Sequence, residues 1–256
     1  MFVKELYRYR QLIWSLVIRD LKARYRGSLL GFIWTFLNPL LLMLVYVLVF
    51  LVYMRIEMEN YAVFLFCGLI PWIWFSSSLM EGVNSVIAGG SLITRSMLSP
   101  EVFPTVKVVS NLINFLLSLP LLFFFIILFK IEVGSPLLAL PIVILIQLIF
   151  TMGLVAIVSA LNVRFRDLQH ILGIFLTLWF FISPILYPLS SIPEEFRVYS
   201  MFNPIAIFST AYQDILFYNR MFDLKGMSAV LVFSIAIYII GTIVFNRYKE
   251  SFAEEI

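Results

Sequence analysis

The chain has 256 residues, of which 62% are hydrophobic, 17% aromatic and only 13% charged, and its mean hydropathy is +1.01. Charged residues make up about a quarter of ordinary soluble domains, so this composition excludes a soluble globular protein and indicates an integral membrane protein. The formal net charge of +3 needs no nucleic-acid partner to explain it.

Residues 1–27 are predicted to form a cytoplasmic helix that lies in the plane of the membrane surface. Polar side chains recur at steps of three or four along one stripe of this helix, and apolar side chains lie opposite. Asp20 and Arg24 interrupt the apolar side one turn apart, where they can pair. No cleavable signal peptide is expected, because about thirty charge-rich residues precede the first apolar run. The stripe consists of Arg8, Gln11, Ser15, Arg19, Lys22 and Arg26, and the opposite side of Leu6, Ile13, Val17 and Leu21.

Two interpretations of this helix stay open. It is either a basic membrane anchor, or a site where some of the arginines receive an anionic lipid head group at the cytoplasmic entrance. Gly27 and Gly31 permit a sharp turn into the first span, although their GxxxG spacing equally suits close helix packing.

Six apolar stretches are long enough to cross a bilayer, which takes roughly 20 residues per helix. None of them carries a charged side chain in its middle. Strands of alternating polarity are absent and backbone groups in lipid must be paired internally, so helices are expected rather than a barrel. The predicted fold is therefore all-α, a polytopic bundle of six transmembrane helices. The spans are placed at 31–54, 61–80, 107–129, 137–161, 171–187 and 228–245.

The connection between the second and third spans is predicted to contain short helices. Gly89 and Gly90 permit a break, and Ser99-Pro100-Glu101 has the residues of a helix start: an N-cap, a first-position proline and an acid in the first turn. This segment is either a passive connector or a lever that docks on another protein.

The external segment, residues 188–226, is too long for a turn and too apolar for a solvated loop. A capping box at Ser191–Glu194 and the pair Asn203-Pro204 predict two short helices. Pro204–Tyr218 is too short, and too polar at Asp214, for a seventh span. We interpret the pair as interfacial or re-entrant helices that either cover the outer mouth of a pathway or serve only as a packed lid.

Basic residues are distributed unequally between the two sides of the predicted bundle. By the positive-inside rule, the richer side is cytoplasmic and holds both termini, as an even number of spans requires. That side holds Lys4, Arg8, Arg10, Arg19, Lys22, Arg24, Arg26, Arg95, Lys107, Arg164, Arg166, Arg247 and Lys249, and the other holds Arg55, Lys130, Arg197, Arg220 and Lys225.

Several classes of function are disfavoured by what the sequence lacks. One cysteine, Cys67, and one histidine, His170, form neither a metal cluster nor a catalytic triad, so no catalytic or metal site is expected. No Gly-Lys dipeptide occurs, which excludes a P-loop. Two alternatives stay open: an ion-coupled secondary transporter, although charged groups are absent within the spans, and a membrane enzyme acting on lipid-linked sugars.

The run from Arg19 to Trp34, followed by Asn38-Pro39, closely resembles the opening of the transmembrane subunits of ABC-2 type polysaccharide exporters. Further segments resemble that family in the same order: 91–104, 162–168, 183–188 and Asn203-Pro204. The O-antigen (Wzm-type) permeases are most similar, and teichoic-acid and capsule permeases share these signatures. The resemblance implies one ABC-2 type transmembrane domain over residues 1–256, with the interfacial helix at 1–27, spans 1–5 at 28–187, gate-like external helices at 188–226, and span 6 with a cytoplasmic tail at 227–256.

The resemblance also implies a function in the bacterial cytoplasmic (inner) membrane. A homodimer of the chain would enclose a channel for lipid-linked polysaccharide, such as O-antigen, among membrane lipids. Two copies of a separate ABC subunit would bind ATP and Mg, so this chain would hold no cofactor. We expect partner coupling at Ser91, Arg95, Ser96 and Glu101, lipid head-group binding at Arg8, Arg24 and Arg26, channel-lining aromatics at Tyr46, Phe115, Trp179 and Tyr187, and an external gate at Pro193, Asn203 and Pro204.

Overall fold

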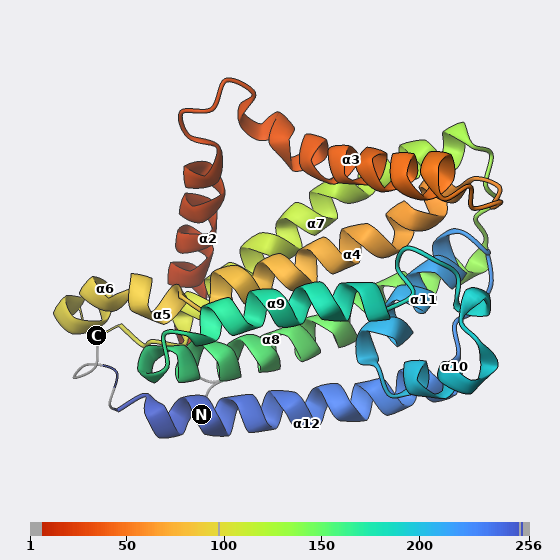
Figure 1. The fold of residues 1–256 in the computed structure, drawn as a ribbon. Helices are drawn as coiled ribbons and strands as arrows, with labels where there is room; N and C mark the ends of the chain where they lie inside the picture. Colours follow the sequence, from red (N-terminus) through yellow and green to blue (C-terminus); the bar gives the residue numbers. More distant parts are fainter. Residues whose placement is uncertain (1–6, 97, 251, 253–256) are drawn as a thin grey trace.

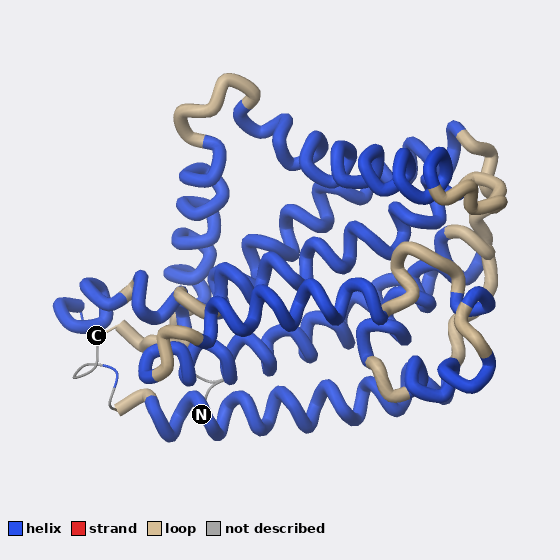
Figure 2. Tube along the Cα trace, viewed as in Figure 1, coloured by secondary structure: helices blue, strands red, loops and turns tan. Residues whose placement is uncertain are grey.

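The computed structural model describes residues 7–96, 98–250 and 252, and the regular elements of that part of the chain are all helices (Figure 2). The predicted all-α class is confirmed. In chain order the helices are α2 (Arg10–Tyr25), η1 (Gly31–Ile33), α3 (Trp34–Val47), η2 (Leu48–Tyr53), α4 (Tyr61–Gly82), α5 (Ser85–Ala88), α6 (Gly90–Ser96), α7 (Val102–Leu128), η3 (Ser135–Ala139), α8 (Leu140–Arg164), α9 (Leu168–Ile182), η4 (Leu189–Ser191), α10 (Glu194–Met201), α11 (Pro204–Leu216) and α12 (Leu224–Tyr248).

Five helical segments of the described chain are long and apolar enough to cross a membrane: Gly31–Tyr53, Tyr61–Gly82, Val102–Leu128, Ser135–Arg164 and Leu224–Tyr248. They run side by side with α9, and α4 lies at the centre of the bundle (Figure 1). Along the most apolar stretch of each helix, 72% of α4 is buried but only 17% of the first span. The first span therefore lies at the edge of the bundle and leaves most of its surface to lipid or to another protein.

α12 packs along α8 at unusually close range. A Cβ added at Gly241 would lie 2.4 Å from the carbonyl oxygen of Gly153, and one added at Gly153 would lie 2.7 Å from the backbone of Tyr238. Small residues let two helix backbones approach in this way, because no side chain stands between them. The two glycines thus set the distance between the last span and the rest of the bundle.

The fifth predicted span is shorter than expected. It was predicted over 171–187, but α9 ends at Ile182, and Ser183 has extended backbone angles before Pro184. A proline disfavours helical geometry in the residue before it, which accounts for the break. The non-helical residues 183–186 are buried, and side chains of neighbouring helices take up their carbonyl groups: Tyr61 donates to Leu186 O at 2.7 Å and Gln213 to Pro184 O at 3.0 Å.

The two predicted external helices are α10 and α11, which follow this break. Asn203 caps α11 as predicted, accepting hydrogen bonds from the backbone N–H groups of Ile205 at 3.0 Å and Ala206 at 3.3 Å. The capping box predicted at Ser191–Glu194 is wrong, because α10 begins at Glu194 without a side-chain cap. Most of α11 is buried against α4, α8 and α12, whereas α10 is largely exposed.

α2 crosses the end of the bundle at a steep angle to the spans, as an interfacial helix must (Figure 1). Its apolar side, Ile13, Leu16 and Val17, is buried against the start of α7, and the predicted polar stripe is exposed. Gly27 and Gly31 have φ values of +79° and +50°, and nothing lies within 4 Å of a Cβ added at either. Here the glycines serve the turn into α3, since left-handed backbone is costly for other residues.

Candidate functional site

A cluster of charged residues joins the interfacial helix to the bundle. Asp20 and Arg24 of α2 face Glu81 at the end of α4 and Lys107 in α7, and Lys107 donates a short hydrogen bond to Asp20. The Arg24 guanidinium lies 2.7 Å from Glu81, donates to Asn111 Oδ1 at 3.1 Å, and lies 3.7 Å from Asp20, as predicted for that pair. The cluster contains equal numbers of cations and anions, so it carries no excess positive charge. It holds α2 against α4 and α7.

The predicted lipid head-group residues are therefore not equivalent. Arg24 is engaged by two carboxylates, and its side chain is 27% exposed. Arg8 and Arg26 are exposed, and Arg8 lies over the ring of Tyr9 at 5.7 Å. Arg8 and Arg26 offer their charge to an anion more readily than Arg24, whose binding to a phosphate would compete with Glu81.

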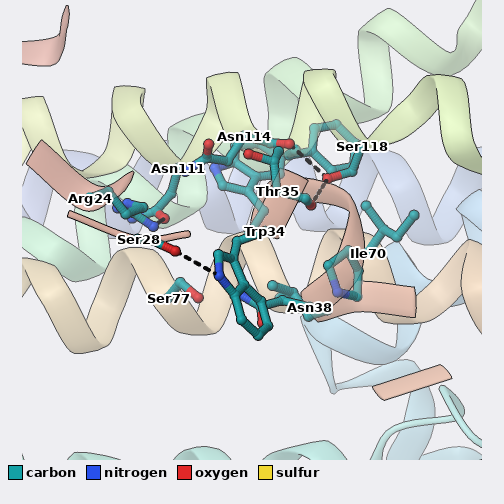
Figure 3. A pocket seen from close by; sticks show the side chains of 14 residues that line it. Arg24, Ser28, Trp34, Thr35, Asn38, Ile70, Ser77, Asn111, Asn114 and Ser118 are labelled. Atoms are coloured by element: carbon teal, nitrogen blue, oxygen red, sulfur yellow. Dashed lines mark hydrogen bonds between the residues drawn. The ribbon is translucent and has the colours of Figure 1, made fainter. Parts of the chain in front are cut away.

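A groove leads from this cluster along α3, α4 and α7 (Figure 3). Its volume is about 410 Å³, within the roughly 300–1,000 Å³ of small-ligand sites. Figure 3 shows that nearly all the labelled side chains around it are polar. The lining residues that carry hydrogen-bonding groups are Arg24, Ser28, Trp34, Thr35, Asn38, Trp74, Ser77, Asn111, Asn114 and Ser118.

The predicted channel aromatics fall in separate places. Phe115 is buried and stacks on Trp74, with ring centroids 5.1 Å apart, beside the groove. Tyr46 lies in a second hollow between α3, α4 and α9, 5.4 Å from the ring of Phe180. Trp179 and Tyr187 line a third hollow beneath α10. Of the four predicted channel aromatics, the structure places only Trp179 and Tyr187 in the same hollow.

The third hollow contains most of the predicted gate. Asn203 accepts a hydrogen bond from the Trp179 indole at 2.7 Å and donates one to Ser183 at 2.9 Å. Asn203 thus fixes the start of α11 to the end of α9 as well as capping its own helix. Pro204 also lines this hollow, whereas Pro193 precedes α10. At the other end of α11, burial raises the pKa of the Asp214 carboxyl, and the nearby Arg220 guanidinium, 2.7 Å away, offsets part of that rise.

The predicted partner-contact segment lies at the same end of the bundle as α2 (Figure 1). Ser91 in α6 is exposed, whereas the side chains of Arg95 and Ser96 lie outside what the structure describes. Glu101 is only 1% exposed, and its Oε1 lies 3.0 Å from Lys249 Nζ. Lys249 also donates to Ser99 Oγ at 2.9 Å. The helix α7 begins at Val102 with Glu101 at its N-cap position, so the start predicted at Ser99 is too early.

Lys249 and Phe252, beyond the last helix, were missed by the sequence analysis. Phe252 is 1% exposed, and its ring lies 5.4 Å from that of Phe245, in a small core with Val86 and Ile93. The tail thus packs against α5, α6 and the start of α7 and holds them together. Hydropathy gave no signal for this, because charged residues after a last span are equally expected at any cytoplasmic end.

No three His, Cys, Asp or Glu side chains gather to form a possible metal site in the described ranges. Cys67 is buried in α4. The geometry thus presents a polar groove, a hollow beneath α10 and a segment before α7 that is ion-paired to the tail.

The sequence matches the ABC-2 type transporter family over residues 11–217. It is 46% identical over 256 residues to the O-antigen export system permease protein RfbA of Myxococcus xanthus, covering 99% of this chain and 98% of the relative. A protein of the same name from Klebsiella pneumoniae is 35% identical over 237 residues, covering 92% and 91%. The polysialic acid transport protein KpsM of Escherichia coli is 24% identical over 259 residues, covering 93% of each chain.

Proposed function

The chain belongs to the ABC-2 type transporter family, and we propose that it is the membrane-spanning subunit of an ATP-driven exporter that moves lipid-linked polysaccharide across the bacterial cytoplasmic membrane. The observation that carries this proposal is similarity along the whole chain to a permease named for O-antigen export. The fold supports it, because the spans form a multi-pass helical bundle without charged residues at their centres. An ion-coupled transporter would place such residues there.

The energy for export would come from a separate ABC subunit that binds ATP and Mg. We propose a homodimer of this chain with two copies of that subunit, with both termini on the cytoplasmic side. The first span is only 17% buried and α9 exposes Ile171, Ile174 and Leu178. These apolar faces leave room for a second copy, and the hollow between α3, α4 and α9 would then face the channel.

Movement of the ATP-binding partner would be transmitted to this chain through the segment from Ser91 to Glu101. Ser91 is exposed for contact with the partner, whereas Glu101 is buried and pairs with Lys249. We propose that Glu101 acts by holding the segment in place rather than by touching the partner. We also propose that Arg95 and Ser96 contact the partner, as the resemblance to the family implies.

The remaining predicted residues would act along the substrate path. Arg8 and Arg26 would attract the lipid diphosphate to the entrance, because a polar stripe with exposed guanidinium groups favours phosphate. Trp179, Tyr187 and Asn203 would form the outer gate beneath α10.

The proposal is tested by purifying the chain from its native membrane, identifying what accompanies it, and measuring ATP hydrolysis. Recovery of a P-loop protein whose hydrolysis falls with Glu101→Ala or Arg95→Ala supports a powered exporter. Recovery of the chain alone, without ATPase activity, favours the ion-coupled or enzymatic alternatives. Export by Arg8→Gln and Arg26→Gln at wild-type rates would remove the head-group role of those residues.

A further inference from the structure

The groove between α3, α4 and α7 is more polar than its position in the bundle requires. In α7, Asn111, Asn114 and Ser118 follow one another at helical spacing toward the middle of the span. The seven helical steps from Asn111 to Ser118 correspond to about 10 Å of helix. Polar side chains at this depth are costly in lipid and are found where they have a function. The groove thus provides a path of hydrogen-bonding groups leading inward from the membrane surface.

Some of these groups are free to bind a ligand. Arg24 bonds Asn111, and the Trp34 indole donates to Ser28 at 3.0 Å. The side chains of Asn38 and Ser77 also line the groove, and within the described ranges they make no hydrogen bond to the protein. Asn38 therefore presents two donors and an acceptor, and Ser77 a hydroxyl.

The charge of the groove selects against an anion. Among the described residues that line it, Arg24 is the one cation and is balanced by Glu81 and Asp20, and the other polar lining groups are amides, hydroxyls and indoles. Hydrocarbon is equally unsuited, since it would leave the amide of Asn38 without partners. A sugar ring fits both requirements, because its hydroxyls both donate and accept and its C–H faces pack on an aromatic ring such as Trp34.

We propose that this groove binds an uncharged sugar ring attached to a membrane lipid. The lipid would lie beside the edge span α3, with its phosphate at the membrane surface near Arg26, and the sugar would enter past Arg24. The volume of about 410 Å³ accommodates a mono- or disaccharide. Only the identification of this sugar with the exported substrate rests on the proposed function.

The test uses the full chain with its ATPase partner in lipid nanodiscs. The probe is a short prenyl diphosphate carrying a disaccharide with a photoreactive diazirine on the sugar. A second probe carries the diazirine on the same prenyl diphosphate without sugar. We expect the sugar probe to crosslink to groove residues of α3 and α7, and the sugar-free probe not to do so.

Variants of residues that make few contacts locate the site. Asn38→Leu should lower groove crosslinking of the sugar probe roughly tenfold, as expected for the loss of one or two hydrogen bonds to a neutral ligand. Binding of the sugar-free probe should be unchanged in this variant. Leu44→Ala is the matched control, because Leu44 is 50% exposed on the same helix and does not line the groove.

The source of the sugar is decided by competition. Excess unlabelled prenyl-diphosphate disaccharide that suppresses crosslinking, where glucosyl diacylglycerol does not, assigns the groove to the substrate. Suppression by both assigns it to membrane-bound sugars in general. Crosslinks outside the groove, or an unchanged yield in Asn38→Leu, overturn the inference. Export by the wild-type complex is measured in parallel, so the inference can fail while the proposed function stands.

Discussion

Replacing Lys249 with methionine should destabilise the protein by about 3 kcal/mol. Glu101 is 1% exposed and its Oε2 has no hydrogen-bond partner in the described chain, so Lys249 supplies the charge that balances it. Removing one partner of a buried ion pair costs about 3–5 kcal/mol. The lower end applies because the Lys249 side chain is 27% exposed and water reaches that side of the pair. A loss of this size changes the folding equilibrium by roughly a factor of 150.

The loss is measured by unfolding the purified chain in mixed detergent micelles. Arg247→Met is the matched control, since Arg247 is exposed and lies at the same helix end. In the double variant Lys249→Met, Glu101→Gln the stability should largely return, because neither charge is then left unpaired. If Lys249→Met unfolds at the same denaturant concentration as Arg247→Met, the ion pair does not hold the partner-contact segment and the reasoning is refuted.

Three further outcomes are expected. Gly241→Ala should cost about 1–3 kcal/mol in the same unfolding assay, because the added Cβ would lie 2.4 Å from a carbonyl oxygen of α8, whereas Gly173→Ala, with no atom closer than 3.9 Å, should be tolerated. Asn203→Ala should cost about 1 kcal/mol and increase hydrogen exchange in the first turn of α11; unchanged exchange would show that the cap is unimportant. Burial raises the pKa of Asp214, so its protonated form stabilises the fold at low pH and this contribution is lost as pH rises through the raised pKa. The melting temperature of Asp214→Asn relative to wild type should therefore increase from about pH 4 to about pH 7, and a constant difference would contradict that assignment.

The sequence was sufficient to predict the features that depend on local pattern. Apolar length located the five long spans and the shorter apolar helix α9, and Asn203-Pro204 marked a helix start that the structure confirms with two cap hydrogen bonds. The positive φ at Gly27 and Gly31 likewise agrees with the predicted turn. In each case the responsible residues lie within a few positions of the structure that they determine.

Features that depend on distant partners were not predictable in this way. Glu101 has the position of a helix-start acid, yet it pairs with Lys249 near the other end of the chain. The groove did leave a signal that was not used: Lys107, Asn111, Asn114 and Ser118 form a polar row on an otherwise apolar span.

The two ion clusters lie on the same short stretch of α7, and this has a mechanical consequence. Glu101 ties the start of α7 to the end of α12, and Lys107, less than two turns later, ties it to α2. A displacement of the segment that precedes α7 therefore meets resistance from both helices and moves them with α7. α3 has no charged side chain to join this unit; it follows α2 through the turn at Gly27 and Gly31, and the Ser118 hydroxyl of α7 donates a long hydrogen bond to Thr35 O at 3.4 Å. We expect the groove between α3 and α7 to change width when the start of α7 moves, because ion pairs hold one wall to α2 and α12, whereas the other wall meets α7 through neutral contacts alone.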